Sequence, residues 1–270
     1  MSALPAAASV PILEVERLTR RFGGLTALSE VSFAINRGEI YGLIGPNGAG
    51  KTTLFNVLTG IYQQNEGVIR FQGAVLRGAT PDRIAKLGIA RTFQNIRLFG
   101  NLSALENVMI GRHVRTKAGV AGAIFRDKGT RAEEAAIVKR ARELLDYVGI
   151  GSRGNEHARH LPYGDQRRLE IARALATDPK LLALDEPAAG MNATEKRELR
   201  KLLVSIRNDG TTILIIEHDM RLVMGLCDRV LVLDYGRKIA EGTAADVQKD
   251  PKVIAAYLGG EVSLNLKGAA

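Results

Sequence analysis

The stretch Gly45-Pro46-Asn47-Gly48-Ala49-Gly50-Lys51-Thr52-Thr53 decides the fold of this chain. It follows the apolar run 40–44, which predicts a buried strand, and it precedes 54–58, which predicts the first turns of a helix. A strand, a glycine-rich turn and a helix form the context of a phosphate-binding P-loop. The three glycines allow backbone dihedrals that are closed to other residues, so consecutive N–H groups can turn inward around a phosphate. The N-terminus of the helix adds its partial positive charge.

The polar side chains at the end of this stretch fit the same ligand. Lys51 can reach the β- and γ-phosphates of a nucleotide, and the Thr52 hydroxyl can bind a magnesium ion. The alternative is a tight strand-to-helix turn without a ligand, which the spacing, the Lys-Thr pair and the flanking context together disfavour. The sequence therefore predicts nucleotide and magnesium binding.

Composition limits the class of protein. The 270 residues are 46% hydrophobic and 25% charged, which is typical of a globular chain with one large domain or two modest ones. No apolar run is long enough to span a bilayer. Residues 1–11 have no basic region and contain two prolines, so we expect a short disordered leader rather than a signal peptide. The single cysteine, Cys227, excludes an internal disulfide framework and fits a reducing cytosol.

The net charge of +9 is unevenly distributed. Residues 111–142 hold nine Lys or Arg against three Asp or Glu, a surplus of six. A basic face of this kind can meet anionic lipid head groups, nucleic acid or an acidic partner, or it can be a solvated helical face. Phe125 is the one aromatic residue of the segment, which disfavours nucleic acid because bases stack on aromatic rings.

The chain alternates between strand and helix patterns. Strands are predicted at 12–18, 31–35, 40–44, 67–71, 89–94, 181–184, 211–216, 230–233 and 238–240. Helices are predicted from 54, at 81–87 with Thr80 as N-cap, from 102 to about 145 with a break around Gly119, Gly122 and Gly129, at 164–176, and at 194–207 with Thr194 as N-cap. This order predicts an α/β fold: a mostly parallel core sheet, an antiparallel edge and an inserted helical lobe.

Polar residues follow several of the predicted core strands. In doubly wound sheets, ligands bind at the carboxyl ends of the strands, where the P-loop, Gln94, Asp185 and His218 all fall. Asp185 is suited to hold magnesium, and Glu186 is a candidate to polarise an attacking water. The competing interpretations are a surface turn for the two carboxylates and a core histidine for His218.

The ordered set of motifs resembles an ATP-binding-cassette ATPase from about Leu13 to Leu258. The resemblance implies a P-loop NTPase fold in one domain, 12–258, with a helical lobe at about 95–178 and a loose tail at 259–270. It also implies roles for individual residues: Gln94 contacts magnesium and the attacking water, Glu186 is the catalytic base, and His218 touches the γ-phosphate. Phe22 falls where the family stacks an aromatic ring on adenine. The signature loop, which covers the ATP of a partner cassette, corresponds to Leu161, Pro162, Tyr163, Gly164, Asp165 and Gln166.

Within that family the chain is similar to the Liv-type ATP-binding subunits of branched-chain amino acid importers. The similarity lies in the stretches 45–61, 91–99, 161–174, 188–192 and 216–220, and in the basic insertion after Gly111. It implies a peripheral protein on the cytoplasmic face of the membrane. Its implied partners are a second ATPase chain, two permease chains and an extracellular or periplasmic substrate-binding protein, without nucleic acid. Two residues depart from the family pattern, because Pro162 replaces the usual serine and Asn192 the usual aspartate.

Other functions stay open at this point. The same ATPase could serve another cargo, such as a polar amino acid, an amide, urea or an exported lipid. A soluble cassette acting on ribosomes or in DNA repair is a further alternative. Such proteins usually carry two cassettes or a long coiled coil, whereas this chain has one P-loop and no sustained heptads.

Overall fold

The computed structural model describes residues 11–115 and 128–257. They divide into two compact units: residues 11–79 with 207–257, and residues 80–115 with 128–206. The predicted leader, apart from Pro11, and the predicted tail lie outside the described residues, as do Gly119 and Gly122. Within the described residues, no helix has both the length and the apolar character that a membrane crossing requires.

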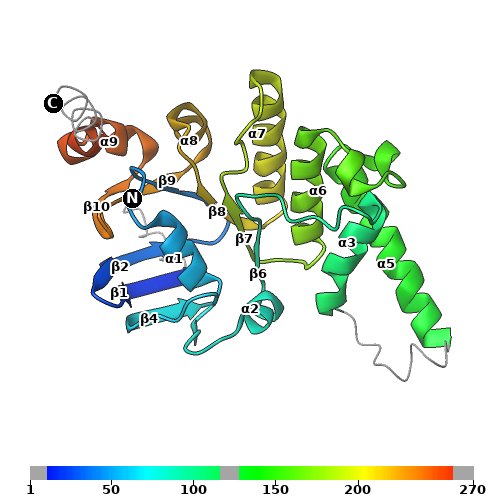
Figure 1. The fold of residues 1–270 in the computed structure, drawn as a ribbon, viewed down its shortest axis with the longest axis horizontal. Coiled ribbons are helices and arrows are strands. Elements are labelled where there is room, and N and C mark those ends of the chain that lie inside the picture. Colours follow the sequence, from blue (N-terminus) through cyan, green and yellow to red (C-terminus); the bar gives the residue numbers. More distant parts are fainter. Residues whose placement is uncertain (1–10, 116–127, 258–270) are drawn as a thin grey trace, which may run out of the picture. The chain divides into compact units, whose positions relative to one another are not determined.

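The first unit contains an antiparallel sheet in the order β2-β1-β4-β5. Its strands are β1 (Leu13–Phe22), β2 (Leu25–Ile35), β4 (Glu66–Phe71) and β5 (Ala74–Val75), drawn in blue to cyan in Figure 1. Leu13 pairs with Ile35 on one side and with Phe71 on the other. The predicted antiparallel edge is confirmed, but β1 and β2 are longer than predicted. The apolar alternation marks only their buried parts, and exposed polar residues such as Arg21 continue the pairing.

The first unit also carries parallel strands that position the P-loop. β3 (Ile40–Ile44) lies between β8 (Thr212–Ile216) and β9 (Arg229–Asp234) and is parallel to both. All residues of β3 and β8 are buried, as continuous apolar runs predict for strands covered on both faces. β9 turns back into β10 (Arg237–Gly242), which confirms the predicted hairpin. The helices of this unit include α1 (Lys51–Leu58), α8 (Met220–Leu226) and α9 (Ala244–Lys249), and residues 251–257 are helical as well.

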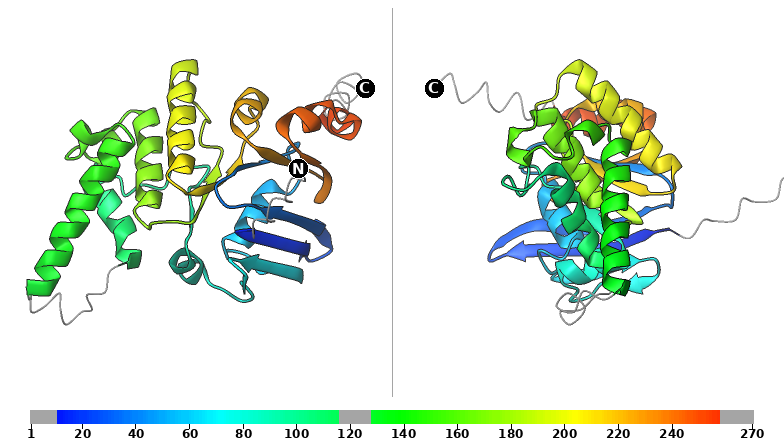
Figure 2. Two further views of the ribbon diagram at one scale, coloured as in Figure 1. Left: turned by 180° about the vertical axis from the view of Figure 1, so that it is seen from behind. Right: turned by 90° about the vertical axis from the view of Figure 1, so that its right-hand side faces the viewer.

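The second unit is mainly helical. Helix α3 (Ala104–Arg112) packs against α5 (Lys128–Tyr147) and α6 (Tyr163–Leu175), as the left view of Figure 2 shows. The parallel pair β6 (Ile89–Arg91) and β7 (Leu181–Asp185) joins Ile89 to Leu181 and Arg91 to Ala183. Helices α2 (Pro81–Leu87) and α7 (Ala193–Asn208) complete the long elements, and short 3₁₀ turns occupy His113–Arg115, Gly151–Arg153 and Ala158–His160. The predicted helix 81–87 with Thr80 as N-cap is confirmed.

Three local predictions in this unit are wrong. The strand predicted at 89–94 ends at Arg91, so Gln94 lies in the following loop. Gly129 lies inside α5 rather than at a break. Asn192, not Thr194, caps α7, because its side-chain oxygen accepts the N–H groups of Thr194 (2.9 Å) and Glu195 (3.0 Å). The Glu195 carboxylate accepts the N–H of Asn192 in return (2.8 Å), which completes a reciprocal capping box.

Candidate nucleotide-binding site

The P-loop starts where β3 ends and has the backbone that a phosphate cradle needs. Gly45, Gly48 and Gly50 have φ values of 151°, 78° and 100°. A Cβ atom at position 45 would lie 2.1 Å from the Leu233 carbonyl oxygen, so no larger residue fits between this turn and β9. Gly50 is the N-cap of α1 in the left-handed conformation, which places the N-terminus of that helix at Lys51. The loop therefore meets the conditions for binding an anion at a helix N-terminus.

Lys51 is held inside the loop that it serves. Its ammonium group donates to the carbonyl oxygens of Gly45 (2.7 Å) and Pro46 (2.9 Å), and 9% of the residue is exposed. Asn47, Gly48 and Thr52 are exposed, whereas Ala49 is buried against the fold. A lysine that bridges two carbonyls of the turn keeps the loop in shape and presents its charge at the place where phosphates would sit.

The first unit brings His218 to the same sheet edge as the P-loop. Leu43 pairs with Ile216 in the parallel ladder, and Gly45 and His218 each follow two residues later. His218 is exposed, and its N–H donates to the carboxylate of the buried Glu217 (3.3 Å). Asp219 caps α8 by accepting from the N–H groups of Arg221 (3.0 Å) and Leu222 (3.2 Å). The turn after β8 is therefore fixed by its own side chains.

Phe22 lies at the last position of β1, and 38% of the residue is exposed. Its ring meets Tyr62 edge-on with centroids 5.1 Å apart, and the Arg20 guanidinium lies 4.3 Å from its centroid. Neither Tyr62 nor Arg20 was predicted as part of the site, since their contact depends on how β1 lies against the segment after α1. This exposed aromatic group offers a face on which a base could stack.

The second unit brings together three of the predicted polar residues. The Gln94 amide donates to the Glu186 carboxylate (3.1 Å) just beyond the ends of β6 and β7. Asp185, at the end of β7, is 4% exposed; its N–H donates to the Thr92 hydroxyl (3.3 Å), and its carboxylate lies 3.7 Å from the Arg91 guanidinium. Glu186 adopts a left-handed conformation with φ of 46°. Sequence reasoning missed Arg91 and Thr92, because nothing in a short strand pattern indicates that they would contact the carboxylate and the backbone N–H of Asp185.

Burial affects Arg91 as well. Desolvation lowers the pKa of its guanidinium, and the nearby Asp185 carboxylate opposes that shift by favouring the charged form. The pair thus keeps a carboxylate and a cation close together in a largely dry environment. Carboxylates at such a rim suit a hard cation such as magnesium.

The signature loop leads directly into α6. Pro162 is the N-cap of this helix, with φ −53° and ψ 152°, and the Gln166 amide donates back to the Leu161 carbonyl (2.8 Å). Gly164 is buried, and a Cβ at that position would lie 2.8 Å from a Glu195 side-chain oxygen, so a larger residue there would require the Glu195 side chain to shift. Asp165 forms an ion pair with Arg153 (3.1 Å), which offsets part of its negative charge.

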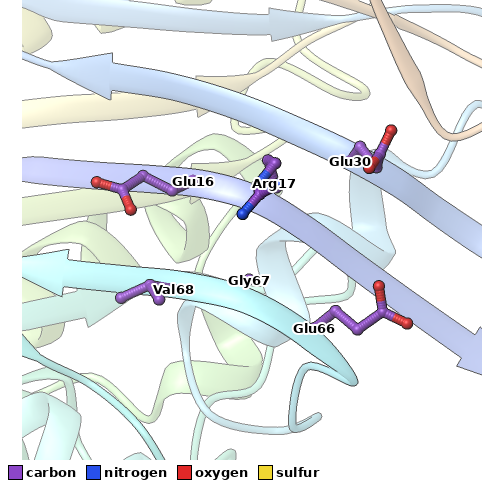
Figure 3. A pocket seen from close by; sticks show the side chains of 6 residues that line it. All are labelled: Glu16, Arg17, Glu30, Glu66, Gly67 and Val68. Atoms are coloured by element: carbon purple, nitrogen blue, oxygen red, sulfur yellow. The ribbon is translucent and has the colours of Figure 1, made fainter.

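A separate hollow lies on the antiparallel sheet, with a volume of about 220 Å³ (Figure 3). It forms because β1 bulges at Arg17, where the pairing with both neighbouring strands shifts. Two of its carboxylates are already paired, Glu16 with Arg70 and Glu66 with Arg21, both at 2.6 Å. These are ordinary surface ion pairs, and none of the residues that line the hollow is among the predicted site residues.

The P-loop and the two carboxylates at the end of β7, Asp185 and Glu186, define a nucleotide-hydrolysing protein of the P-loop class. The family model described as ABC transporter matches residues 28–189, and the chain belongs to this family and is an ATPase. A second model, described as branched-chain amino acid ATP-binding cassette transporter, matches residues 237–263.

Individual relatives agree with that family. The high-affinity branched-chain amino acid transport ATP-binding protein LivG of Salmonella typhimurium is 45% identical over 252 residues, covering 93% of this chain and 99% of the relative. A solved ADP conformation of an ATP-binding cassette of an ABC transporter has a TM-score of 0.81 at 33% identity, covering 93% of this chain and 100% of that one. A dimeric cassette bound to ADP and Pi has a TM-score of 0.73 at 25% identity, covering 86% and 98%.

Proposed function

We propose that this ATPase powers the import of branched-chain amino acids as the ATP-binding subunit of an ABC transporter. The observation that supports the cargo most directly is the 45% identity to LivG over 99% of that protein's length. The family model matched at residues 237–263 supports the same cargo from a separate part of the chain. The similarity to LivG therefore extends over nearly the whole chain, and the second family model adds the C-terminal residues 237–263.

ATP binds, in this proposal, through the P-loop residues Gly45, Pro46, Asn47, Gly48, Ala49, Gly50, Lys51, Thr52 and Thr53. The positive φ values of the three glycines and the hydrogen bonds from the Lys51 ammonium group to two carbonyls of the loop support this role. Phe22 stacks on the base, which is consistent with its exposed ring at the end of β1. His218 senses the γ-phosphate from the neighbouring strand end.

Hydrolysis depends on the carboxylates that follow β7. Glu186 acts as the base that takes a proton from the attacking water, and Gln94 holds its carboxylate through the 3.1 Å hydrogen bond. Thr52, Gln94 and Asp185 would hold magnesium, because hydroxyl, amide and carboxylate oxygens are its preferred ligands. When bound, the ion neutralises charge on the β- and γ-phosphates.

The working unit contains more than this chain. We infer a second cassette whose signature loop covers the ATP bound here, consistent with the dimeric cassette to which the fold is similar. Two permease chains and a substrate-binding protein complete the importer, and the chain sits peripherally on the cytoplasmic face of the membrane. The surplus of six positive charges at 111–142 is compatible with anionic lipid head groups nearby.

The test is to tag this chain, isolate the intact membrane complex and identify its companions. We expect two permease chains and a second cassette. Uptake of labelled leucine, isoleucine and valine should also disappear when the wild-type chain is replaced by Glu186→Gln. Normal uptake of all three, together with lost uptake of a polar amino acid, an amide or urea, would transfer the proposal to that cargo.

A further inference from the structure

The loop that carries Gln94 is held by charged side chains from one face of α6. Arg167, Glu170 and Arg173 are spaced by three residues, so they project from the same side of the helix. All three bind the backbone of residues 93–97. This helix begins at the signature loop, so one element connects that loop to Gln94.

Arg167 provides the central contact. Its two terminal nitrogens donate to the carbonyl oxygens of Phe93 (2.9 Å) and Gln94 (2.5 Å), and one of them also donates to the Tyr163 hydroxyl (2.9 Å). The planar guanidinium satisfies several acceptors at once, which a lysine ammonium on a flexible stem does less well. This forked pair of hydrogen bonds from Arg167 therefore fixes two consecutive peptide groups, and with them the direction in which the Gln94 side chain leaves the backbone.

Glu170 and Arg173 extend the same attachment. Glu170 accepts the Phe93 N–H (3.1 Å) and lies 3.4 Å from Arg167, and Arg173 donates to the Arg97 carbonyl (2.5 Å). The side chains of Arg167 and Glu170 are 3% and 1% exposed. Burial raises the pKa of the Glu170 carboxyl, while the Phe93 N–H and the arginines oppose that rise. A dry ion pair of this kind is costly to bury and adds little net stability, so its contribution to geometry is the more direct explanation.

We propose that Arg167 is a positioning residue for ATP hydrolysis, which fixes the Gln94 backbone from the signature helix and thereby holds the Gln94 amide against Glu186. The inference rests on the proposed roles of Gln94 and Glu186. It links the start of α6, where Tyr163 also touches Arg167, to the carboxylate that activates water. A shift of this helix would move Gln94 with it.

The test is a double-mutant cycle in the full-length chain with Arg167→Lys and Gln94→Ala. Lysine keeps a positive charge beside Glu170, so the fold should survive, but it cannot reproduce the fork. We expect Arg167→Lys to lower kcat about 10- to 100-fold while the Kd for ATP without magnesium stays within about twofold of wild type. Since Arg167 acts through Gln94, the double variant should be no slower than Gln94→Ala alone.

Arg168→Lys is the matched control, because Arg168 is the next residue of α6 and donates to Val148 (3.4 Å) instead. It should keep wild-type kcat. If the kcat losses of Arg167→Lys and Gln94→Ala multiply, or if Arg167→Lys hydrolyses ATP normally, the inference is wrong although the proposed function stands. If Gln94→Ala itself keeps wild-type kcat, the proposed role of Gln94 fails and the inference fails with it. Thermal unfolding of each variant shows whether a lower kcat comes from a destabilised fold. If Arg167→Lys is destabilised, the combined variant Arg167→Met with Glu170→Gln, which removes both charges of the buried pair, takes its place in the same cycle.

Discussion

Lys51 holds its positive charge within its own loop through the carbonyls of Gly45 and Pro46. Lys51→Ala should weaken ATP binding by about 100-fold or more, because charge-assisted contacts to the phosphates are lost. A nucleotide titration measures the Kd. Lys201→Ala, which removes a surface lysine paired with Glu198, is the control and should bind normally. An unchanged Kd for Lys51→Ala would remove the basis for the P-loop assignment.

Glu186 makes a second prediction possible, because glutamine has nearly its shape. Glu186→Gln should keep the Kd for ATP and lower kcat by about 100-fold or more, since the hydrogen bond to Gln94 can survive while the base is lost. Phosphate release and nucleotide titration, measured on the same preparation, check the two halves. Phosphate release at the wild-type rate would assign the base to another residue.

Cys227 is a buried thiol whose pKa burial raises to about 12, with smaller contributions from Asp228 and Glu217. The position is crowded, since a Cβ at Gly42 would lie 3.0 Å from its sulfur. At pH 8 the thiolate fraction is lower than that of a free cysteine by about a thousandfold, because each pKa unit changes it about tenfold. We expect a disulfide reagent to label the native protein very slowly and the denatured protein at once. Rapid labelling of the native protein would show that the segment between α8 and β9, which contains Cys227, opens in solution.

At the scale of elements, the sequence predicts the parts that are fixed by local pattern. The sequence predicts β3 and β8 because each is a continuous, mostly apolar run, which is typical of a strand buried on both faces. The strand predicted at 89–94 stops at Arg91 because Arg167 and Glu170, more than 70 residues away along the chain, bind the backbone of Phe93 and Gln94. No local pattern contains that information. The same holds for Arg91 and Thr92, whose roles depend on which residues β7 brings opposite them.

The cap of α7 gives a prediction at this scale. Asn192 and Glu195 form the capping box, and Asn192 stands where the family pattern has an aspartate. Asn192→Ala should lower the free energy of unfolding by about 1 kcal/mol, whereas Asn192→Asp should preserve it, because either oxygen can accept the helix N–H groups. Denaturant unfolding measures both. If Asn192→Asp is also destabilised, the amide must make a contact that a carboxylate cannot.

At the scale of the whole molecule, the proposed dimer makes Pro162 the most informative departure from the family. Pro162 caps α6 with φ −53° and ψ 152°, close to the φ −64° and ψ 163° of Ser103, which caps α3. Serine therefore fits the backbone at position 162 without strain. Proline offers no donor to a partner's phosphate from its side chain or its backbone. The Gly164 N–H and the N-terminus of α6 must supply that contact instead. The Asp165 carboxylate lies nearby, and Arg153 offsets part of its negative charge.

Pro162→Ser should therefore strengthen ATP-driven dimerisation, tested in a Glu186→Gln background so that ATP persists. A hydrogen bond to a charged group is worth roughly 1.5–3 kcal/mol, so the ATP concentration at half-dimerisation should fall by about 10-fold or more. Light scattering across an ATP series measures it. Pro162→Ala is the matched control, because it removes the ring without adding a hydroxyl, and Asn192 is present in every variant compared. If the serine variant dimerises no better than the alanine variant, the backbone N–H groups at the start of α6 already suffice to bind the phosphate.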